Sequence, residues 1–296
     1  MKTQKLFLMA IIGLLLISSC KKDEDPEVSM KNITVNISGL EDLGADYVYE
    51  GWLIVNGSPV STGTFTVDAN GTLSETMFEL NASDVDNASK FVLSIEPKND
   101  SDPAPAATKM MAGDFSGASA PLGIDPVGDF MNVMGKYILA TPTDGPDTNE
   151  NSGIWFLDLS TGSPTVGLDL PVLPDGWKYE GWVVIDGQPV TTGTFTMVAA
   201  TDDADPFSGS MALPDVNGMD GFFPGEDFLM NAPSMLNFPT DIAGGTAVIS
   251  VEPSPDNSPN PFTLKPLVHN IPAAAMDHTV YDMGHNLSFP TGTVTR

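Results

Sequence analysis

Cysteine is almost absent from this chain: Cys20 is the single one among 296 residues. No intramolecular disulfide can form, so the usual covalent support of exported domains is missing. The fold must draw its stability from a hydrophobic core. A chain of this length can build that core as one large unit or as two units of ordinary size.

Basic residues are also scarce, with 12 Lys and Arg against 39 Asp and Glu and a formal net charge of −27. A field of this sign repels phosphate backbones and anionic head groups. Nucleic acid is therefore not an expected partner. Acidity also keeps a surface protein soluble, so the charge alone indicates no cation ligand.

Familiar catalytic motifs are missing as well. The sequence contains no G-x-S-x-G, H-E-x-x-H, G-x-G-x-x-G or P-loop pattern. The single thiol is assigned to lipid below, so no thiol nucleophile remains. These absences favour a protein that is not an enzyme and that uses no cofactor or metal.

One long apolar run stands at the N-terminus. Lys2 and Lys5 are followed by the twelve apolar residues from Leu6 to Ile17. This run is too short to cross a hydrocarbon core, which takes about 20 helical residues. The pattern is typical of a signal peptide, which we place at residues 1–19.

The residues Ile17-Ser18-Ser19-Cys20 resemble the lipobox of bacterial lipoproteins. The resemblance implies that Cys20 is the first mature residue and carries acyl chains of the palmitate type, which anchor the protein stably when two or more are present. Residues 20–30 then form an acidic tether. The stretch Lys21-Lys22-Asp23-Glu24-Asp25 resembles the export signal of surface lipoproteins in one Gram-negative phylum. We expect a lipid-anchored protein on the outer face of the outer membrane, with a periplasm-facing protein as the alternative.

A stretch of nineteen residues occurs twice. YEGWLIVNGSPVSTGTFTV begins at Tyr49, YEGWVVIDGQPVTTGTFTM begins at Tyr179, and twelve positions are identical. The flanking order of apolar runs, Glu-Pro pairs and Pro-rich loops repeats too. We expect two tandem units, at residues 31–145 and 151–296, joined by the segment TPTDGPDTNENSG as a hinge.

Both units are predicted to consist of β-strands. Trp52–Val55 and Trp182–Ile185 are short apolar runs, which predicts central strands covered on both faces. Asn56-Gly57 and Asp186-Gly187 predict tight hairpin turns, with return strands at 62–67 and 192–197. The run at 91–95 ends at Glu96-Pro97 and predicts a further strand. The expected fold is all-β, with one Ig-like β-sandwich in each unit.

The second unit carries about 26 extra residues, near 198–245, because the Glu-Pro pairs are offset more than the repeated stretches. Insertions of this kind lie on surface loops, where binding often resides. This one is unusually apolar. It is either a binding patch or local core packing, and its apolar residues are Phe222, Phe223, Phe228, Met230, Met235, Leu236 and Phe238.

The repeated pattern resembles the extracytoplasmic C-terminal domain of anti-sigma-K factors. The matching residues in the first unit are Tyr49, Trp52–Ile54, Gly57, Pro59–Ser61, Gly63, Phe65–Val67, Ile95–Pro97 and Ala112-Gly113. Those in the second unit are Tyr179, Trp182, Gly187, Pro189, Val190, Gly193, Phe195, Glu252 and Pro253, with a departure at Val268-His269. The resemblance implies a fold and an extracytoplasmic setting. Sigma-factor inhibition is not carried over, since membrane-bound members have a transmembrane helix and a sigma-binding segment that we do not find here.

Two glutamates recur in each unit, Glu50 with Glu96 and Glu180 with Glu252. As a pair they could act as acid and base or bind a hard cation. Alternatively they accept hydrogen bonds from turn amides or a tryptophan N–H. Their place in fold-defining strands favours the structural role.

Other candidate ligands are weaker. His269, His278 and His285 lie near Asp277 and Asp282, but their spacing matches no familiar zinc motif. The hinge offers oxygen ligands without calcium-loop spacing, namely Asp144, Asp147, Asn149, Glu150 and Asn151.

Three functions remain open. We expect a non-enzymatic surface lipoprotein with a binding or structural role, whose partner would be an extracellular protein or glycan. The alternatives are an accessory protein of envelope signalling and a hydrolase of exported polymers that uses the paired glutamates.

Overall fold

The computed structural model describes residues 29–145, 147–216, 219–220, 223–256 and 258–296. The expected signal peptide, Cys20 and nearly all of the tether lie outside these residues. The helical elements of the described part are α1 (Ala82–Asn87) and the 3-10 helix η1 (Glu150–Ser152). All other regular elements there are strands, so the expected all-β fold is confirmed.

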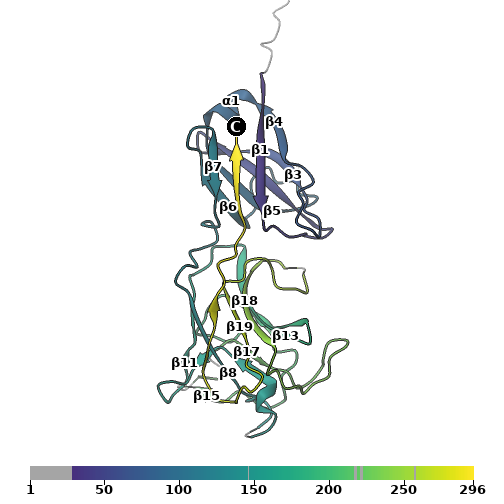
Figure 1. Ribbon diagram of the computed structural model, residues 1–296, viewed down its shortest axis with the longest axis vertical. Helices are drawn as coiled ribbons and strands as arrows, with labels where there is room; N and C mark the ends of the chain where they lie inside the picture. The colour runs from purple at the N-terminus through teal and green to yellow at the C-terminus, as the bar shows by residue number, and fades with distance from the viewer. Residues whose placement is uncertain (1–28, 146, 217–218, 221–222, 257) are drawn as a thin grey trace, which may run out of the picture.

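The strands form two lobes, one above the other in Figure 1. Two four-stranded antiparallel sheets build the first lobe. One has the order β3-β2-β5-β6, with β3 (Ser58–Phe65), β2 (Tyr47–Val55), β5 (Ala88–Pro97) and β6 (Lys109–Asp114). The other has the order β4-β1-β22-β7, with β4 (Met77–Asn81), β1 (Met30–Ser38), β22 (Thr291–Thr295) and β7 (Ser119–Leu122).

The second lobe repeats this arrangement. Its first sheet has the order β14-β13-β18-β19-β21, with β14 (Gln188–Phe195), β13 (Trp177–Ile185), β18 (Thr246–Pro253), β19 (Leu267–Asn270) and β21 (Gly284–His285). Its second sheet has the order β12-β8-β9-β17, with β12 (Leu168–Asp169), β8 (Met134–Leu139), β9 (Gly153–Trp155) and β17 (Gly225–Asp227), and β20 (Tyr281–Asp282) also pairs with β8. Two small hairpins complete it: β10 (Leu157–Asp158) with β11 (Thr165–Val166), and β15 (Asp215–Val216) with β16 (Met219–Asp220).

The repeated stretch folds into the same hairpin in both lobes. Asn56 and Gly57 have φ angles of 50° and 83°, and Asp186 and Gly187 have 50° and 82°. Positive φ at both central residues is the type I′ turn, which Asn-Gly and Asp-Gly tolerate best. The predicted hairpins are confirmed.

The pairing register is also shared. Tyr49 lies opposite Phe65 and Tyr179 opposite Phe195, and a bulge follows Gly51 and Gly181 alike. The return strands begin directly after the turns, earlier than predicted, because a two-residue turn brings the next residue opposite the end of the first strand. β2 and β13 are central, as expected, since each pairs on both sides.

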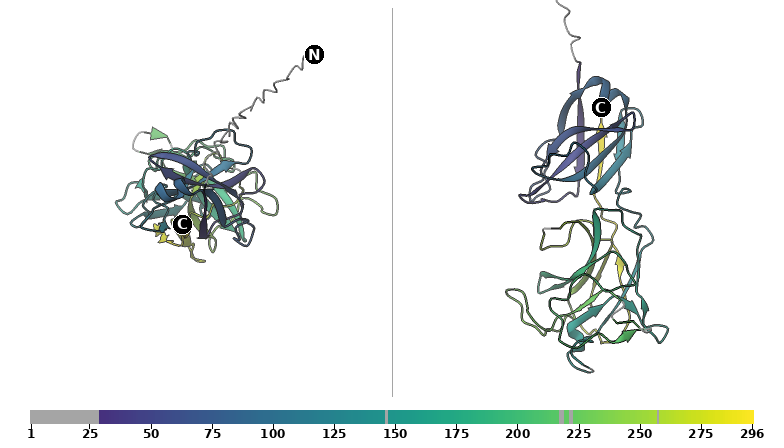
Figure 2. Two further views of the ribbon diagram at one scale, coloured as in Figure 1. Left: turned by 90° about the horizontal axis from the view of Figure 1, so that it is seen from above. Right: turned by 180° about the vertical axis from the view of Figure 1, so that it is seen from behind.

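The closing strand of each repeat lies in the other lobe. β22 pairs with β1 and β7 of the first lobe, whereas β8 pairs with β9 and β20 of the second. The yellow C-terminal strand is seen within the first lobe in Figures 1 and 2. β8 therefore holds in the second lobe the place that β22 holds in the first.

This exchange differs from the expected unit boundaries. Residues 134–145, expected in the first unit, belong to the second lobe, and residues 291–295, expected in the second unit, belong to a sheet of the first. Chain order does not decide which sheet a strand completes; its hydrogen-bonding partners do. The expected hinge at 141–153 is wrong for the same reason, since it joins the adjacent strands β8 and β9.

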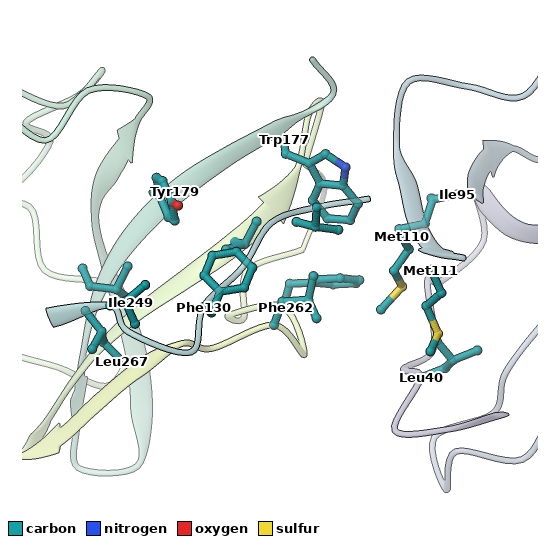
Figure 3. Packing of buried hydrophobic residues seen from close by; sticks show 14 of the residues in the cluster. Leu40, Ile95, Met110, Met111, Phe130, Trp177, Tyr179, Ile249, Phe262 and Leu267 are labelled. Atoms are coloured by element: carbon teal, nitrogen blue, oxygen red, sulfur yellow. The ribbon is translucent and has the colours of Figure 1, made fainter. Parts of the chain in front are cut away.

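One hydrophobic core runs through both lobes. Figure 3 shows Met110 and Met111 of the first lobe facing Phe262 and Trp177 of the second, and all four side chains are at most 3% exposed. The hydroxyl of Thr263 also donates to the carbonyl of Gly39 across the boundary, at 2.9 Å. The lobes are therefore packed against each other as well as connected.

We predict that Val294→Asp unfolds the first lobe, although residue 294 follows the whole second lobe in sequence. Val294 is fully buried, so the change places an unpaired carboxylate in the core and should cost about 3 kcal/mol or more. Urea denaturation measures the loss, and hydrogen exchange locates it in β1 and β7. The exposed neighbour variant Thr295→Asp is the control. Unchanged protection of β1 in Val294→Asp would contradict the placement of β22.

Candidate functional site

Glu96 lies on the face of the β3-β2-β5-β6 sheet that points away from the core, next to Trp52. The indole Nε1 of Trp52 donates to Ser94 Oγ at 2.8 Å, and Ser94 donates in turn to Glu96 Oε1. The amide of Ala106 donates to the same oxygen at 2.8 Å. Glu50, on the neighbouring strand, accepts the hydroxyl of Ser61. The first pair of candidate carboxylates is thus part of a hydrogen-bonded network.

The second lobe repeats this network. Trp182 Nε1 donates to Ser250 Oγ at 2.8 Å, Ser250 donates to Glu252 Oε1, and the amide of Phe262 donates to that oxygen at 2.9 Å. Glu180 accepts the hydroxyl of Thr191. Burial raises the pKa of Glu180 to about 7 and that of Glu252 to about 8.

The networks fit the structural interpretation of the repeated glutamates. In each lobe the two carboxylates lie close enough that the charge of one raises the pKa of the other, as a smaller contribution than burial. Each accepts a hydrogen bond from a serine or threonine, and Glu96 and Glu252 also accept one from a loop amide. None of the four lines any of the cavities described below.

The three histidines are not brought together. His269 Nδ1 lies 2.9 Å from the Tyr137 hydroxyl, His285 Nε2 contacts the carbonyl of Val133, and His278 lies beside Asp277 at 3.1 Å. Among the residues that the structure describes, no group of three or more His, Cys, Asp or Glu side chains could hold a metal ion. The candidate zinc cluster is therefore not assembled.

Two of the candidate oxygen ligands of the β8–β9 loop, Glu150 and Asp144, accept hydrogen bonds from other residues of the loop and its ends. Glu150 Oε2 accepts the amide of Thr141 at 3.0 Å, and Asn149 donates to Asp144. Asn151 donates weakly to the carbonyl of Ala275 at 3.5 Å, and its own Oδ1 is buried without a partner. These bonds fix the loop against the second lobe rather than forming a calcium clasp.

The insertion is not a separate surface loop. Its centre forms β17, which pairs with β9, and Glu226 and Asp227 on this strand are fully buried. Phe228 and Phe238 pack with Phe207, with ring centroids 5.4 to 6.2 Å apart. Leu236 packs partly buried on the same core, Met230 and Met235 are exposed, and Phe222 lies outside the described residues.

An apolar cavity of about 470 Å³ opens where the insertion covers β8 and β9. We call it the β8–β9 pocket. Its floor is Ile138, Ala140, Trp155 and Leu157, and the insertion adds Met211, Leu213 and Phe223. Its ionisable lining residues are Glu150 and His278. A cavity of this size with an apolar lining and few polar groups is typical of small-molecule sites.

Buried polar groups hold the floor of the pocket in place. Trp155 Nε1 donates to Asp227 Oδ1 at 2.8 Å, and Asp227 Oδ2 accepts the amide of Thr143 at 2.8 Å. Burial raises the pKa of Asp227, while these hydrogen bonds lower it. The indole ring is therefore oriented by the insertion strand β17 and by the β8–β9 loop together.

A smaller, polar cavity of about 200 Å³ shares Trp155 and Leu213 with the pocket. Asp202 lines it and accepts the amide of Gly225 at 2.9 Å. Burial raises the pKa of Asp202 to about 8 and that of the neighbouring Glu226 to about 7. Both groups take up protons close to neutral pH.

Residues 27–110 match the family model of the anti-sigma-K factor RskA C-terminal domain. The matched segment runs from β1 to the start of β6 and so includes the hairpin and the Trp52–Glu96 network. No curated protein and no solved structure matches the chain.

The first lobe is thus similar to an RskA C-terminal domain, as the resemblance implied. The second lobe shares its hairpin, register and acidic network without being part of the match. In the described part of the chain, we find no helix long and apolar enough to cross a membrane.

The pocket and Trp155 on its floor were not predicted from the sequence. A signal was present: β1 alternates buried and exposed residues, whereas the run Ile154–Leu157 is apolar at every position. A strand that is apolar on both faces needs a cover on each. The apolar run therefore predicts that another part of the chain covers the outer face of β9.

We predict that the second lobe is more stable in mild acid than at pH 8. Glu180, Glu252, Asp202 and Glu226 all have folded pKa values raised above their unfolded values. Their contribution to stability is complete below about pH 4, and the free energy of unfolding decreases as the pH rises to between 7 and 8, because the folded lobe binds protons that the unfolded chain has already lost. Urea denaturation between pH 5 and pH 8.5 measures it.

Glu252→Gln should weaken the dependence of the unfolding free energy on pH. The amide oxygen of glutamine can still accept both hydrogen bonds, but the side chain does not titrate. Glu79→Gln, an exposed change on β4, is the control and should leave that dependence unchanged. An unfolding free energy of the wild type that rises steadily from pH 5 to pH 8 would contradict the buried, proton-carrying state of these acids.

Proposed function

We propose that this protein is a lipid-anchored, non-enzymatic binding protein of the bacterial cell surface that captures its ligand in the β8–β9 pocket. The observation that carries the proposal is the pocket itself, an open apolar cavity built from the insertion of the second lobe. The two lobes act as a rigid scaffold for it. The partner would be a small molecule, a glycan or a group on an extracellular protein.

The position of the pocket supports this role. β1 begins at the outer end of the first lobe, and β8 and β11 lie in the lobe at the opposite end (Figures 1 and 2). With acyl chains on Cys20, ahead of β1, the first lobe would lie next to the membrane. The pocket would then lie in the lobe that is farther from the membrane.

The state of the acidic side chains supports binding over catalysis. The paired glutamates are hydrogen-bonded in the same way in both lobes and line none of the described cavities. Glu96, Glu180 and Glu252 are buried, whereas a hydrolase that used these pairs would need both carboxyl groups of a pair within reach of substrate.

Envelope signalling is the second candidate, and the family match favours it. The match supports an anti-sigma-factor-like regulatory role in coarse terms. Deleting the gene separates the two functions: transcription that depends on an alternative sigma factor should change if the protein regulates it, and should not if it only captures a ligand.

We predict that Cys20→Ala releases the protein from the membrane fraction, because the lipid anchor depends on that thiol. Fractionation and immunoblotting measure this. Ser19→Ala, which keeps a small residue before the cysteine, should stay in the membrane. Protease added to intact cells should degrade the wild-type protein if it lies on the cell surface. If the protease degrades it only after the cells are lysed, the protein faces the periplasm. Retention of Cys20→Ala in the membrane would contradict the anchor.

We also predict that Met211→Glu abolishes ligand capture by the soluble chain from Lys21 onward, while Met235→Glu does not. Both methionines belong to the insertion and are exposed, but only Met211 lines the pocket. Pull-down from spent culture medium and glycan arrays measure capture. These point changes are sharper than deleting the insertion, which would remove β17 and the buried Phe228. Equal capture by both variants would place the binding site elsewhere.

A further inference from the structure

The outer face of the sheet that carries the β8–β9 pocket differs from its counterpart in the first lobe. There, β1 turns Asn32, Thr34 and Asn36 outward, all exposed, and β22 turns Thr291 outward. In the second lobe the corresponding strands, β9 and β8, turn Trp155 and Ile138 outward, at 6% and 4% exposure. The shared fold therefore does not require an apolar outer face.

The insertion covers this apolar face only in part. Phe223 and Leu213 pack on Ile138, Ala140, Trp155 and Leu157 and form a small second core. Beside them a cavity of about 470 Å³ stays open, more than twice the volume of the cavity at the boundary between the lobes. A lining of indole, phenyl and aliphatic groups gains free energy by excluding water, so it favours an apolar occupant.

The charges around the cavity select against an anion. Among the residues that the structure describes, no Lys or Arg lines the pocket, while Glu150 does. His278 is the one possible cation there, and Asp277 already lies 3.1 Å from it. Lys136, on the outer face of β8, is paired with Asp158 at 3.0 Å and lies 3.9 Å from Asp282.

An anionic ligand would thus lose its hydration without gaining a charged partner, and it would meet the field of a chain with net charge −27. We propose that the β8–β9 pocket takes an uncharged apolar small molecule and rejects an anion of the same shape. This inference rests on the proposed binding function and specifies its ligand class.

Two fluorescent probes of nearly identical shape test it. N-phenyl-1-naphthylamine is uncharged, and 8-anilino-1-naphthalenesulfonate is the same ring system with a sulfonate. The soluble chain from Lys21 onward should bind the uncharged probe about tenfold or more tightly than the sulfonate at low salt. Bound probe should also quench tryptophan emission, since Trp155 forms the floor of the pocket.

Variants locate and explain the selectivity. Met211→Glu should weaken binding of the uncharged probe about tenfold, whereas Met235→Glu should leave its affinity unchanged. Glu150→Gln keeps an acceptor for the Thr141 amide but removes the charge, so it should narrow the difference between the two probes. Circular dichroism and urea denaturation confirm that each variant is folded.

Three results would overturn the inference: equal affinity for both probes, binding of the uncharged probe that Met211→Glu leaves intact, or no binding of either probe. If neither probe binds but a protein or glycan is captured in a manner sensitive to Met211→Glu, the ligand class is wrong and the binding function stands. If Met211→Glu affects neither probes nor capture, the pocket is not the binding site and both proposals fail.

Discussion

The hydrogen bonding of β22 between β1 and β7 is the constraint on which the rest of the structure depends. It returns the chain to the first lobe after the second is complete, and β8 makes the opposite exchange. Each lobe thus lacks one strand of its own and takes it from the other repeat. The exchange, together with the core shared through Met110, Met111, Trp177 and Phe262, ties the two lobes into one body.

The same exchange creates the pocket. Because β8 rather than β22 closes the second lobe, Ile138 and Ala140 come to lie beside Trp155 on the outer face of that sheet. The insertion then supplies Phe223 and Leu213 above them and Asp227 behind the indole. The pocket thus lies on the second lobe, whereas the outer face of the corresponding sheet in the first lobe is polar.

Local chemistry made much of the fold predictable. Asn-Gly and Asp-Gly specify their turns through backbone geometry, and the two-sided apolar runs after Trp52 and Trp182 specify central strands. The repeated glutamates could be assigned a structural role because both copies keep them within fold-defining strands. These inferences depend on residues close together in sequence.

The features that could not be predicted depend on distant partners. The closing stretches, MGKYILA at 134–140 and TGTVT at 291–295, are each good strands, and nothing in them states which sheet they join. The β8–β9 loop looked like a hinge because its Pro, Gly, Asp and Asn content is the same in a hinge and in a turn between paired strands. The insertion looked like a surface loop because β17 is only three residues long. The pocket could not be predicted because its floor and its cover lie some 70 residues apart in the chain.

A crystal structure of the soluble chain grown with N-phenyl-1-naphthylamine would show the ligand site and the strand exchange together. We expect the probe between Trp155, Leu157 and Phe223 on the outer face of β8 and β9, with β22 hydrogen-bonded between β1 and β7 in the same molecule. A cavity filled by the protein's own side chains, with the probe bound elsewhere or absent, would contradict it.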